Sequence, residues 1–243
     1  MRVLVTGATG FIGAALLPGL ISGGHEVVAA TRRPQRYQGP GEAVGFDVDD
    51  PASVDAALAG CDAAYYLVHG MADTGDFVAR DRRAAEAFGA AARRHRVKVV
   101  YLGGLGDHEA SAERSAHLRS RHEVGRVLRE RAETVELQAA IVIGNGSIAF
   151  EIMRQLVDRL PAMVCPSWVT TRSQPIAIDD MVRYLVAGLD LAAGAYQVGG
   201  ADVLSYEQMM NHYAQVIGRR RVVLKVPVLT PRLSAHWIGL VTD

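Results

Sequence analysis

Short apolar runs alternate with longer amphipathic segments through the first two-thirds of the chain. The apolar runs have the length and composition of buried strands, whereas the amphipathic segments have the periodicity of helices. Strands are expected over residues 2–6, 25–31, 43–47, 63–68, 97–102 and 135–143. Helices are expected from residue 11 onward and over residues 51–59, 74–95 and 113–131. This alternation predicts an α/β fold, a doubly wound parallel sheet with helices on both faces.

The turn after the first strand is rich in glycine. Gly7, Gly10 and Gly13 have the spacing GxxGxxG between strand 2–6 and the helix that begins at Phe11. Such glycines permit a sharp turn, a close approach to a pyrophosphate and tight packing of the helix on the sheet. The free N–H groups of the first helical turn also favour a phosphate. A βα turn without a ligand is the alternative, but the position between strand and helix predicts a dinucleotide site. Its candidate residues are Gly7, Thr9, Gly10, Phe11, Ile12 and Gly13.

The end of the second strand indicates which dinucleotide is bound. NAD specificity normally needs an acidic residue there, about twenty residues past the glycine turn, to hold the ribose 2′-hydroxyl. The chain has Arg32 and Arg33 instead, and guanidinium groups suit a 2′-phosphate. These residues favour NADP over NAD, the alternative being a solvated basic loop.

Two further strand ends supply candidate cofactor contacts. Asp47 and Val48 end the third strand, where Asp47 is placed to face the adenine amino group. Leu67, Val68 and His69 end the fourth strand and are expected to run beside the cofactor. For His69, an ordinary surface histidine is the alternative.

The regular alternation weakens after residue 143. We expect helices over residues 145–160, 181–189 and 205–217, strands over 174–178 and 196–198, and a loop over 161–171. We therefore expect a nucleotide-binding core over residues 1–145. Residues 146–243 are expected to complete that core at about 174–198 and otherwise to form a small substrate lobe.

Charge and cysteine content exclude several classes of protein. The 26 basic and 26 acidic residues balance, so no overall field favours nucleic acid or an anionic membrane. The sequence has no apolar stretch of about 20 residues and no room for a signal peptide before the strand at Arg2, which predicts a cytoplasmic protein. Cys61 and Cys165 are far apart, and the spacing of His117 and His122 does not suit a metal, so no metal site is expected.

Several segments together resemble one family. They are TGATGFIG at 6–13, FDVDD at 46–50, YYLVHG at 65–70, YLGGLGD at 101–107 and QPIAIDDMVRYL at 174–185. These motifs resemble the extended or atypical branch of the short-chain dehydrogenase/reductase superfamily over nearly the whole chain. The resemblance implies a Rossmann-type domain with a small C-terminal substrate lobe. The branch includes epimerases, dehydratases, reductases and members that bind NADP without turnover.

The chain departs from this family at the catalytic positions. Active members have a Ser or Thr at the end of the fifth strand, where this chain has Gly103 and no hydroxyl over residues 103–106. They also have a Tyr four residues before a Lys, and His117 and Arg121 stand in those places. The resemblance implies that Arg121 holds the nicotinamide ribose, that Gly103 lies beside the cofactor, and that His117 exchanges a proton during hydride transfer. A solvated histidine on a charged helix is the alternative for His117.

The sequence is compatible with two functions. The first is an NADP(H)-dependent oxidoreductase that transfers hydride to or from a carbonyl or activated double bond of a small organic substrate. The second is a non-catalytic NADP(H) sensor, because an intact nucleotide turn accompanies an altered catalytic set. The apolar segment at 227–243 is expected to pack on the lobe. The alternatives are that it caps the substrate pocket, that it contacts a second subunit, or that the chain is a truncated form of a longer protein.

Overall fold

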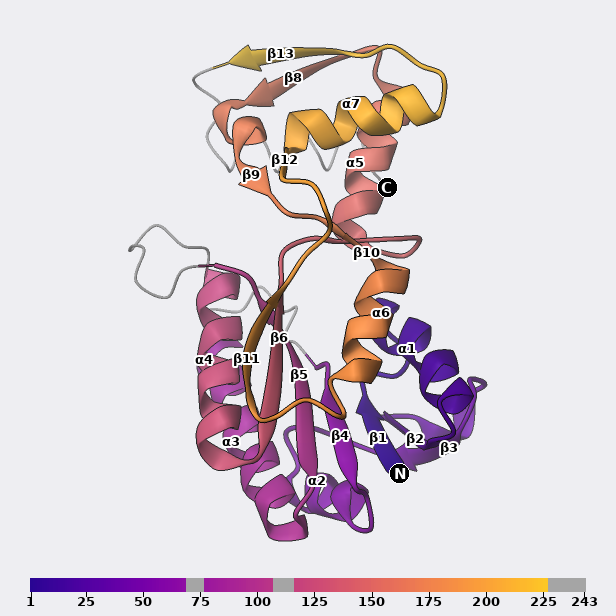
Figure 1. Cartoon of the computed structure of the whole chain (residues 1–243), viewed down its shortest axis with the longest axis vertical. Coiled ribbons are helices and arrows are strands. Elements are labelled where there is room, and N and C mark those ends of the chain that lie inside the picture. The colour runs from indigo at the N-terminus through magenta and orange to yellow at the C-terminus, as the bar shows by residue number, and fades with distance from the viewer. Residues whose placement is uncertain (69–76, 107–115, 227–243) are drawn as a thin grey trace. The chain divides into compact units, whose positions relative to one another are not determined.

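A seven-stranded parallel sheet forms the centre of the first of two units, which comprises Met1–Ala139 and Ile178–Val198. The structure is a computed structural model that describes residues 1–68, 77–106 and 116–226 (Figure 1). The strand order is β11-β6-β5-β4-β1-β2-β3, so the chain crosses over at β1 and the predicted doubly wound fold is confirmed. The strands are β1 (Arg2–Thr6), β2 (Glu26–Thr31), β3 (Glu42–Gly45), β4 (Ala63–Tyr66), β5 (Lys98–Gly104), β6 (Thr134–Ala139) and β11 (Gly194–Val198).

Helices cover both faces of this sheet (Figure 1). One face carries α1 (Phe11–Ser22) and α6 (Ile178–Ala187), which pack against each other. The other carries α2 (Pro51–Leu58), α3 (Phe77–His95) and α4 (Ala116–Arg131). A short 3-10 helix, η1 (Pro34–Arg36), follows β2. The side chain of Asp50 accepts the Ala52 N–H at 3.0 Å and caps α2.

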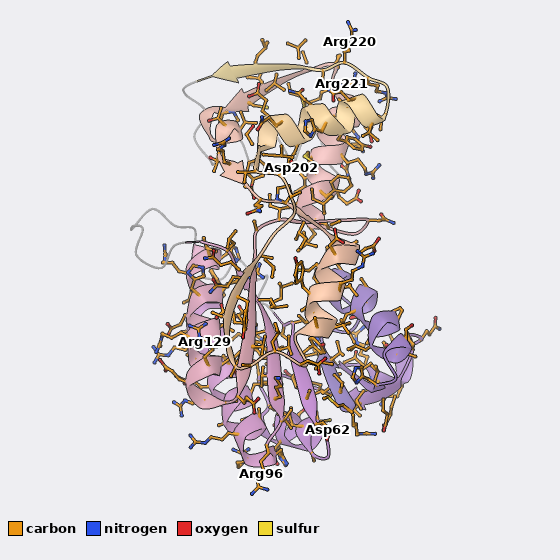
Figure 2. All side chains as sticks on the ribbon, in the orientation of Figure 1. Asp62, Arg96, Arg129, Asp202, Arg220 and Arg221 are labelled. Atoms are coloured by element: carbon orange, nitrogen blue, oxygen red, sulfur yellow. The ribbon has the colours of Figure 1, made fainter. Side chains whose placement is uncertain are left out.

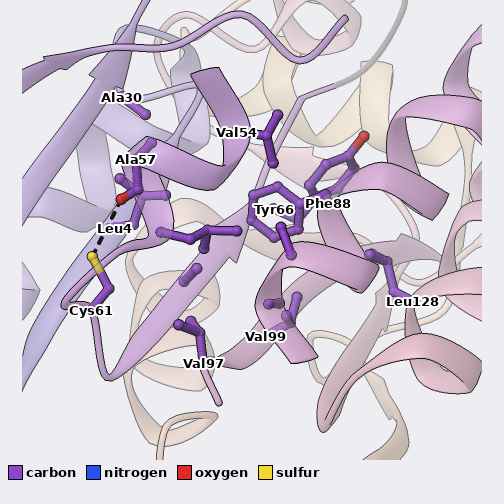
Figure 3. Packing of buried hydrophobic residues seen from close by; sticks show 14 of the residues in the cluster. Leu4, Ala30, Val54, Ala57, Cys61, Tyr66, Phe88, Val97, Val99 and Leu128 are labelled. Atoms are coloured by element: carbon purple, nitrogen blue, oxygen red, sulfur yellow. Dashed lines mark hydrogen bonds between the residues drawn. The ribbon is translucent and has the colours of Figure 1, made fainter. Parts of the chain in front are cut away.

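Alternating side chains on the strands divide the core between the two faces. Leu4 and Tyr66 point toward α2, α3 and α4, where Phe88 lies 4.8 Å from Tyr66 between ring centroids (Figure 3). Tyr65 points to the opposite face, and its hydroxyl donates to the Leu185 carbonyl of α6 at 2.9 Å. Both faces of the sheet are therefore buried, as expected for parallel strands.

The second unit comprises Ala140–Ala177 and Gly199–Asp243. It contains β7 (Val142–Ile143), α5 (Ile148–Arg159), β8 (Ala162–Pro166), η2 (Ser167–Thr170), β9 (Arg172–Ser173), β10 (Ile176–Ala177), β12 (Leu204–Ser205), α7 (Tyr206–Val216) and β13 (Val222–Val226). Its strands pair two by two, and its core includes Val157, Met163 and Met210. Arg220 and Arg221 lie between α7 and β13 (Figure 2), where Arg221 donates to the Val157 carbonyl at the end of α5.

Several predicted boundaries are wrong, among them those of the strand expected over 63–68, which ends at Tyr66, and of the strand expected over 174–178, which is limited to residues 176–177. The strand expected over 135–143 ends at Ala139, which pairs with Gly104, the last residue of β5. Residues 142–143 pair instead with β10. The strand expected over 43–47 ends at Gly45. The helix expected from residue 181 begins at Ile178. Residues 161–171, expected to form a loop, contain β8 and η2.

β8 shows why local patterns fail in this region. Its partner is β13, about 60 residues away and parallel to it, and the sequence predicts no strand there. Pro161 precedes β8 and Pro166 is its last residue; both are typical of loops, so only the distant pairing reveals a strand. The expectations for residues 227–243 lie outside the described residues.

Candidate functional site

The turn between β1 and α1 requires glycine at two of its positions. Gly7 has φ +65°, a conformation that L side chains rarely adopt, and its carbonyl accepts the Gly10 N–H at 2.9 Å. A Cβ on Gly13 would lie 2.2 Å from the Gly7 carbonyl oxygen, so any side chain there would push the helix away from the turn. A Cβ on Gly10 would meet the same oxygen at 3.3 Å. The sharp turn at Gly7 and the close packing at Gly13, both predicted from the sequence, therefore have a geometric basis.

The first turn of α1 is open to an anion. Gly10 is the N-cap residue, no side chain caps the helix, and the first turn contains no acidic residue. The first intrahelical bond of this turn runs from the Ala14 N–H to the Gly10 carbonyl at 2.8 Å, which leaves the N–H groups of Phe11, Ile12 and Gly13 for another acceptor. Thr9 and Gly10 are exposed beside them. This arrangement fits a pyrophosphate, because backbone donors and the helix dipole act at the same place.

Thr6 brings the end of β4 to the glycine turn, a role that the sequence does not reveal. Its hydroxyl donates to the Tyr65 carbonyl and accepts the Leu67 N–H, both at 2.9 Å. A Cβ on Gly7 would lie 3.0 Å from the Leu67 carbonyl oxygen, so the two segments touch. Leu67 and Val68, both half-buried, are thus placed beside the turn, whereas His69 lies outside the described residues.

Arg32 and Arg33 follow the end of β2, the strand next to β1. Both side chains are exposed, and neither forms a hydrogen bond or ion pair with any residue that the structure describes. The Arg33 N–H donates to the Thr31 hydroxyl at 3.3 Å, which turns the chain at the strand end. Two guanidinium groups are therefore available for an anion at this strand end.

The loop after β3 is held by its own side chains. The Asp47 N–H donates to the Ser53 hydroxyl at 2.9 Å, and the Asp49 N–H donates to Asp47 Oδ1 at 3.1 Å. Val48 packs against the core on the α2–α4 face. Asp47 is exposed, and one of its carboxylate oxygens is already used within the loop. We call residues 47–50 the adenine loop, after the contact that the sequence predicts for it.

Arg121 and His117 reach different surroundings from the same helix. Arg121 Nη2 donates to the carbonyls of Leu102 at 2.9 Å and Gly103 at 3.3 Å, at the end of β5. Its Nε is buried and has no hydrogen-bond partner among the described residues. The ring of His117 is exposed and stacks on Phe77, with centroids 4.8 Å apart and planes at 28°. Arg121 thus points to the carboxyl end of β5, and His117 lies against α3.

Two neighbours of Arg121 also fasten α4. The Ser120 hydroxyl donates to Asp81 Oδ2 of α3 at 2.8 Å, and His122 Nε2 lies 3.0 Å from the Gly104 carbonyl oxygen. In addition, the buried Tyr101 hydroxyl donates to the Arg121 carbonyl at 3.0 Å, and burial raises the pKa of Tyr101 to about 12. The sequence gives no signal for these contacts, because they depend on how α4 rotates against the sheet.

A buried carboxylate explains why Gly103 has no side chain. Glu136 of β6 is fully buried and forms an ion pair with Arg129 of α4, which is labelled in Figure 2. A Cβ on Gly103 would lie 2.5 Å from Glu136 Oε1, and a Cβ on Gly125 would lie 2.4 Å from the same atom. A charged side chain from the neighbouring strand therefore fills the space beside Gly103, within the stretch 103–106 where the resemblance implies a hydroxyl. The sequence predicts neither member of this pair.

Metal and membrane sites have no support in the described part of the chain. The described residues contain no group of three or more His, Cys, Asp or Glu side chains that could hold a metal ion. None of the described helices is both long enough and apolar enough to cross a bilayer.

The comparisons with known proteins agree with this geometry. A family model described as NAD(P)H-binding matches residues 7–142, more than half of the chain. The chain therefore belongs to the NAD(P)H-binding family. Solved structures with this fold include short-chain dehydrogenase/reductase and epimerase proteins with bound NAD, so the Rossmann-type fold that the resemblance implies is confirmed.

Individual relatives match smaller parts of the chain. A 2-alkyl-3-oxoalkanoate reductase of Stenotrophomonas maltophilia is 44% identical over 69 residues, 27% of this chain and 21% of the reductase. An uncharacterized protein of Mycobacterium tuberculosis is 40% identical over 63 residues, 26% of this chain and 7% of that protein. The chain thus spans under a quarter of either curated relative. The UDP-glucuronic acid 4-epimerase of Bacillus cereus, solved with NAD, has TM-score 0.77 at 16% identity, covering 93% of this chain and 87% of that one.

Proposed function

We propose that this protein is an NADP(H)-dependent oxidoreductase that transfers hydride to or from a small organic carbonyl or activated double bond. The observation that carries the proposal is the uncapped N-terminus of α1, which starts from a turn that only glycine can form and lies one strand away from two unpaired arginines. The similarity to an oxoalkanoate reductase favours a carbonyl substrate. The buried, free thiols of Cys61 and Cys165 suit the reducing cytoplasm in which we place the protein.

Each part of the cofactor has candidate contacts in the first unit. The N–H groups of Phe11, Ile12 and Gly13 would hold the pyrophosphate, and Arg32 and Arg33 the 2′-phosphate. The adenine would lie against Asp47 and Val48, and the nicotinamide half would follow Leu67, Val68 and Gly103.

His117 and Arg121 would divide the catalytic work. When bound, the cofactor supplies or accepts a hydride at its nicotinamide ring. The unpartnered Nε–H of Arg121 would donate to the nicotinamide ribose, while the other end of its guanidinium stays on β5. His117 makes no hydrogen bond to a described residue, so its ring can give a proton to the substrate oxygen as the carbon receives hydride.

The choice of NADP is tested by exchanging the arginines. Replacing both, as Arg32→Gln with Arg33→Gln, removes two charge-assisted contacts and should weaken NADPH binding roughly 10-fold to 100-fold. NADH binding should change little, because NADH lacks the 2′-phosphate. Arg36→Gln, which removes an exposed arginine of the same segment, is the matched control and should leave both affinities unchanged. Equal loss of NADPH and NADH binding would contradict the assignment.

One observation supports a second candidate, an NADP(H) sensor without turnover. Residues 103–106 contain no hydroxyl and Glu136 fills the space beside Gly103, so the site lacks a group that the resemblance implies for active members. The two functions are separated by NADPH oxidation assayed with a panel of 3-oxo acids, ketones and enones. An oxidoreductase turns over a member of the panel, and His117→Gln reduces that rate with little effect on NADPH affinity. Tight NADPH binding with no turnover favours the sensor.

The assembly of the protein is a further part of the proposal. A small-molecule substrate is its expected partner, with neither nucleic acid nor membrane involved. A homodimer is the assembly that we weigh against a monomer. Light scattering of the protein at several concentrations distinguishes the monomer from the homodimer.

A further inference from the structure

The first turn of α3 contacts the adenine loop on one side. Arg80 Nε lies 3.0 Å from each carboxylate oxygen of Asp49, and a second guanidinium nitrogen also contacts this carboxylate. Such a two-pronged pair fixes orientation as well as distance. The Arg80 guanidinium accordingly holds the pKa of Asp49 below its usual range. The pair ties the helix to the loop at one definite angle.

The position of Asp49 determines the position of Asp47. The Asp49 N–H donates to Asp47 Oδ1 at 3.1 Å, and the Asp47 N–H is itself held by Ser53 at 2.9 Å. A shift of Asp49 would therefore rotate the Asp47 carboxylate that faces the adenine position. Through this short chain of contacts, Arg80 acts on a group that it does not touch.

The same helical turn supports α4 on its other side. Phe77 stacks on the ring of His117 with centroids 4.8 Å apart. One turn later, Asp81 accepts the hydroxyl of Ser120, a side chain that is only 2% exposed. α3 thus makes an aromatic contact and a hydrogen bond with the helical segment that carries His117 and Arg121.

We propose that Phe77, Arg80 and Asp81 are positioning residues that join the adenine loop to the His117 helix. This inference rests on the NADP(H) site proposed above. Binding of adenine at the adenine loop would restrain Asp49. Because Asp49 pairs with Arg80, the first turn of α3 would be restrained as well, and with it the His117 ring that stacks on Phe77. The adenine half of the cofactor would in this way hold His117 in place, although it does not reach that ring.

The size of the effect follows from the exposure of the pair. The side chains of Arg80 and Asp49 are 57% and 38% exposed, so solvent screens their attraction. Exposed pairs of this kind correspond to about a twofold to fivefold change in binding. Arg80→Gln should therefore weaken binding of the adenine half by about that factor and leave the fold intact.

The experiment uses adenosine 2′,5′-bisphosphate, which contains the adenine half of NADP and no nicotinamide. Its affinity is measured by calorimetry, and the Cε1–H resonance of His117 is followed by NMR in protein labelled at histidine, with His117→Gln identifying the signal. Phe77→Leu should move the His117 resonance in the free protein, because it removes the ring current of the stacked phenyl group. Adding the bisphosphate to wild type should shift the same resonance.

The matched control for Arg80→Gln is Arg93→Gln, an exposed arginine of the same helix whose side chain forms no hydrogen bond or ion pair with a described residue. Arg80→Gln should lower the affinity for the bisphosphate twofold to fivefold and abolish the shift of the His117 resonance at saturation. Arg93→Gln should change neither the affinity nor the shift. Exchanging the charges, as Arg80→Asp with Asp49→Arg, should restore part of the affinity and the shift, which a merely unfolded helix would not allow.

The outcomes separate this inference from the proposed function. If wild type binds the bisphosphate and His117 does not shift, or if Arg80→Gln behaves as Arg93→Gln does, the positioning role is refuted and the NADP(H) site stands. If wild type does not bind the bisphosphate at all, the proposed site fails and this inference fails with it.

Discussion

The buried pair of Arg129 and Glu136 gives the sharpest prediction about the framework of the site. Glu136 is fully buried, whereas the Arg129 side chain is 27% exposed, and Gln138 Nε2 donates to Glu136 Oε1 at 3.2 Å. Arg129→Met removes the guanidinium and leaves a carboxylate buried without its counter-charge. Removing one partner of a buried pair costs about 3–5 kcal/mol of unfolding free energy. We expect Arg129→Met to lower stability by that amount.

The double variant and a surface control test the physical reason. Arg129→Met combined with Glu136→Leu removes both charges and should recover most of the loss, because a buried ion pair is weak evidence of net stabilisation. Arg126→Met breaks the exposed pairs with Glu123 and Glu130 on the same helix, and should cost under about 1 kcal/mol. Stability is measured by urea unfolding followed by circular dichroism. A single Arg129→Met variant no less stable than Arg126→Met would refute the reasoning.

Three further predictions follow from other contacts. Gly13→Ala should abolish measurable NADPH binding, because its Cβ would lie 2.2 Å from the Gly7 oxygen; calorimetry with Ala14→Gly as control checks this. Arg96 has φ +58° at the end of α3, so Arg96→Gly should raise the thermal stability by about 0.5–1 kcal/mol, as scanning calorimetry would detect. Tyr101 has a pKa raised to about 12, so the unfolded chain loses this proton first and stability falls as pH rises from about 10 toward 12. That fall in unfolding free energy should be smaller in Tyr101→Phe than in wild type. If urea unfolding between pH 10 and pH 12 gives the same pH dependence for both proteins, Tyr101 does not cause the fall.

The parts of the fold that depend on local pattern could be predicted from the sequence. Gly7, Gly10 and Gly13 mark the nucleotide turn because a turn of this kind needs those residues within a few positions of one another. Asp50 and Pro51 mark the start of α2 for a similar reason. Each signal is contained in a segment of a few residues, and the structure agrees with it.

Contacts between distant segments could not be predicted in this way. Thr6 looks like an ordinary strand residue until its hydroxyl is seen between two residues of β4. Glu136 looks like the polar position of a strand, and only the gaps left by Gly103 and Gly125 make room for it inside. Residues expected to contact the cofactor could therefore be predicted from the sequence, whereas the side chains that position these residues could not.

A calorimetric titration of the wild-type protein with NADPH and then with NADH shows whether the glycine turn holds NADP(H). One molecule of NADPH should bind per chain, and NADH should bind more weakly, because we expect Arg32 and Arg33 to recognise the 2′-phosphate. Equal binding of the two would remove the role of the arginines. Binding of neither nucleotide would contradict the account as a whole.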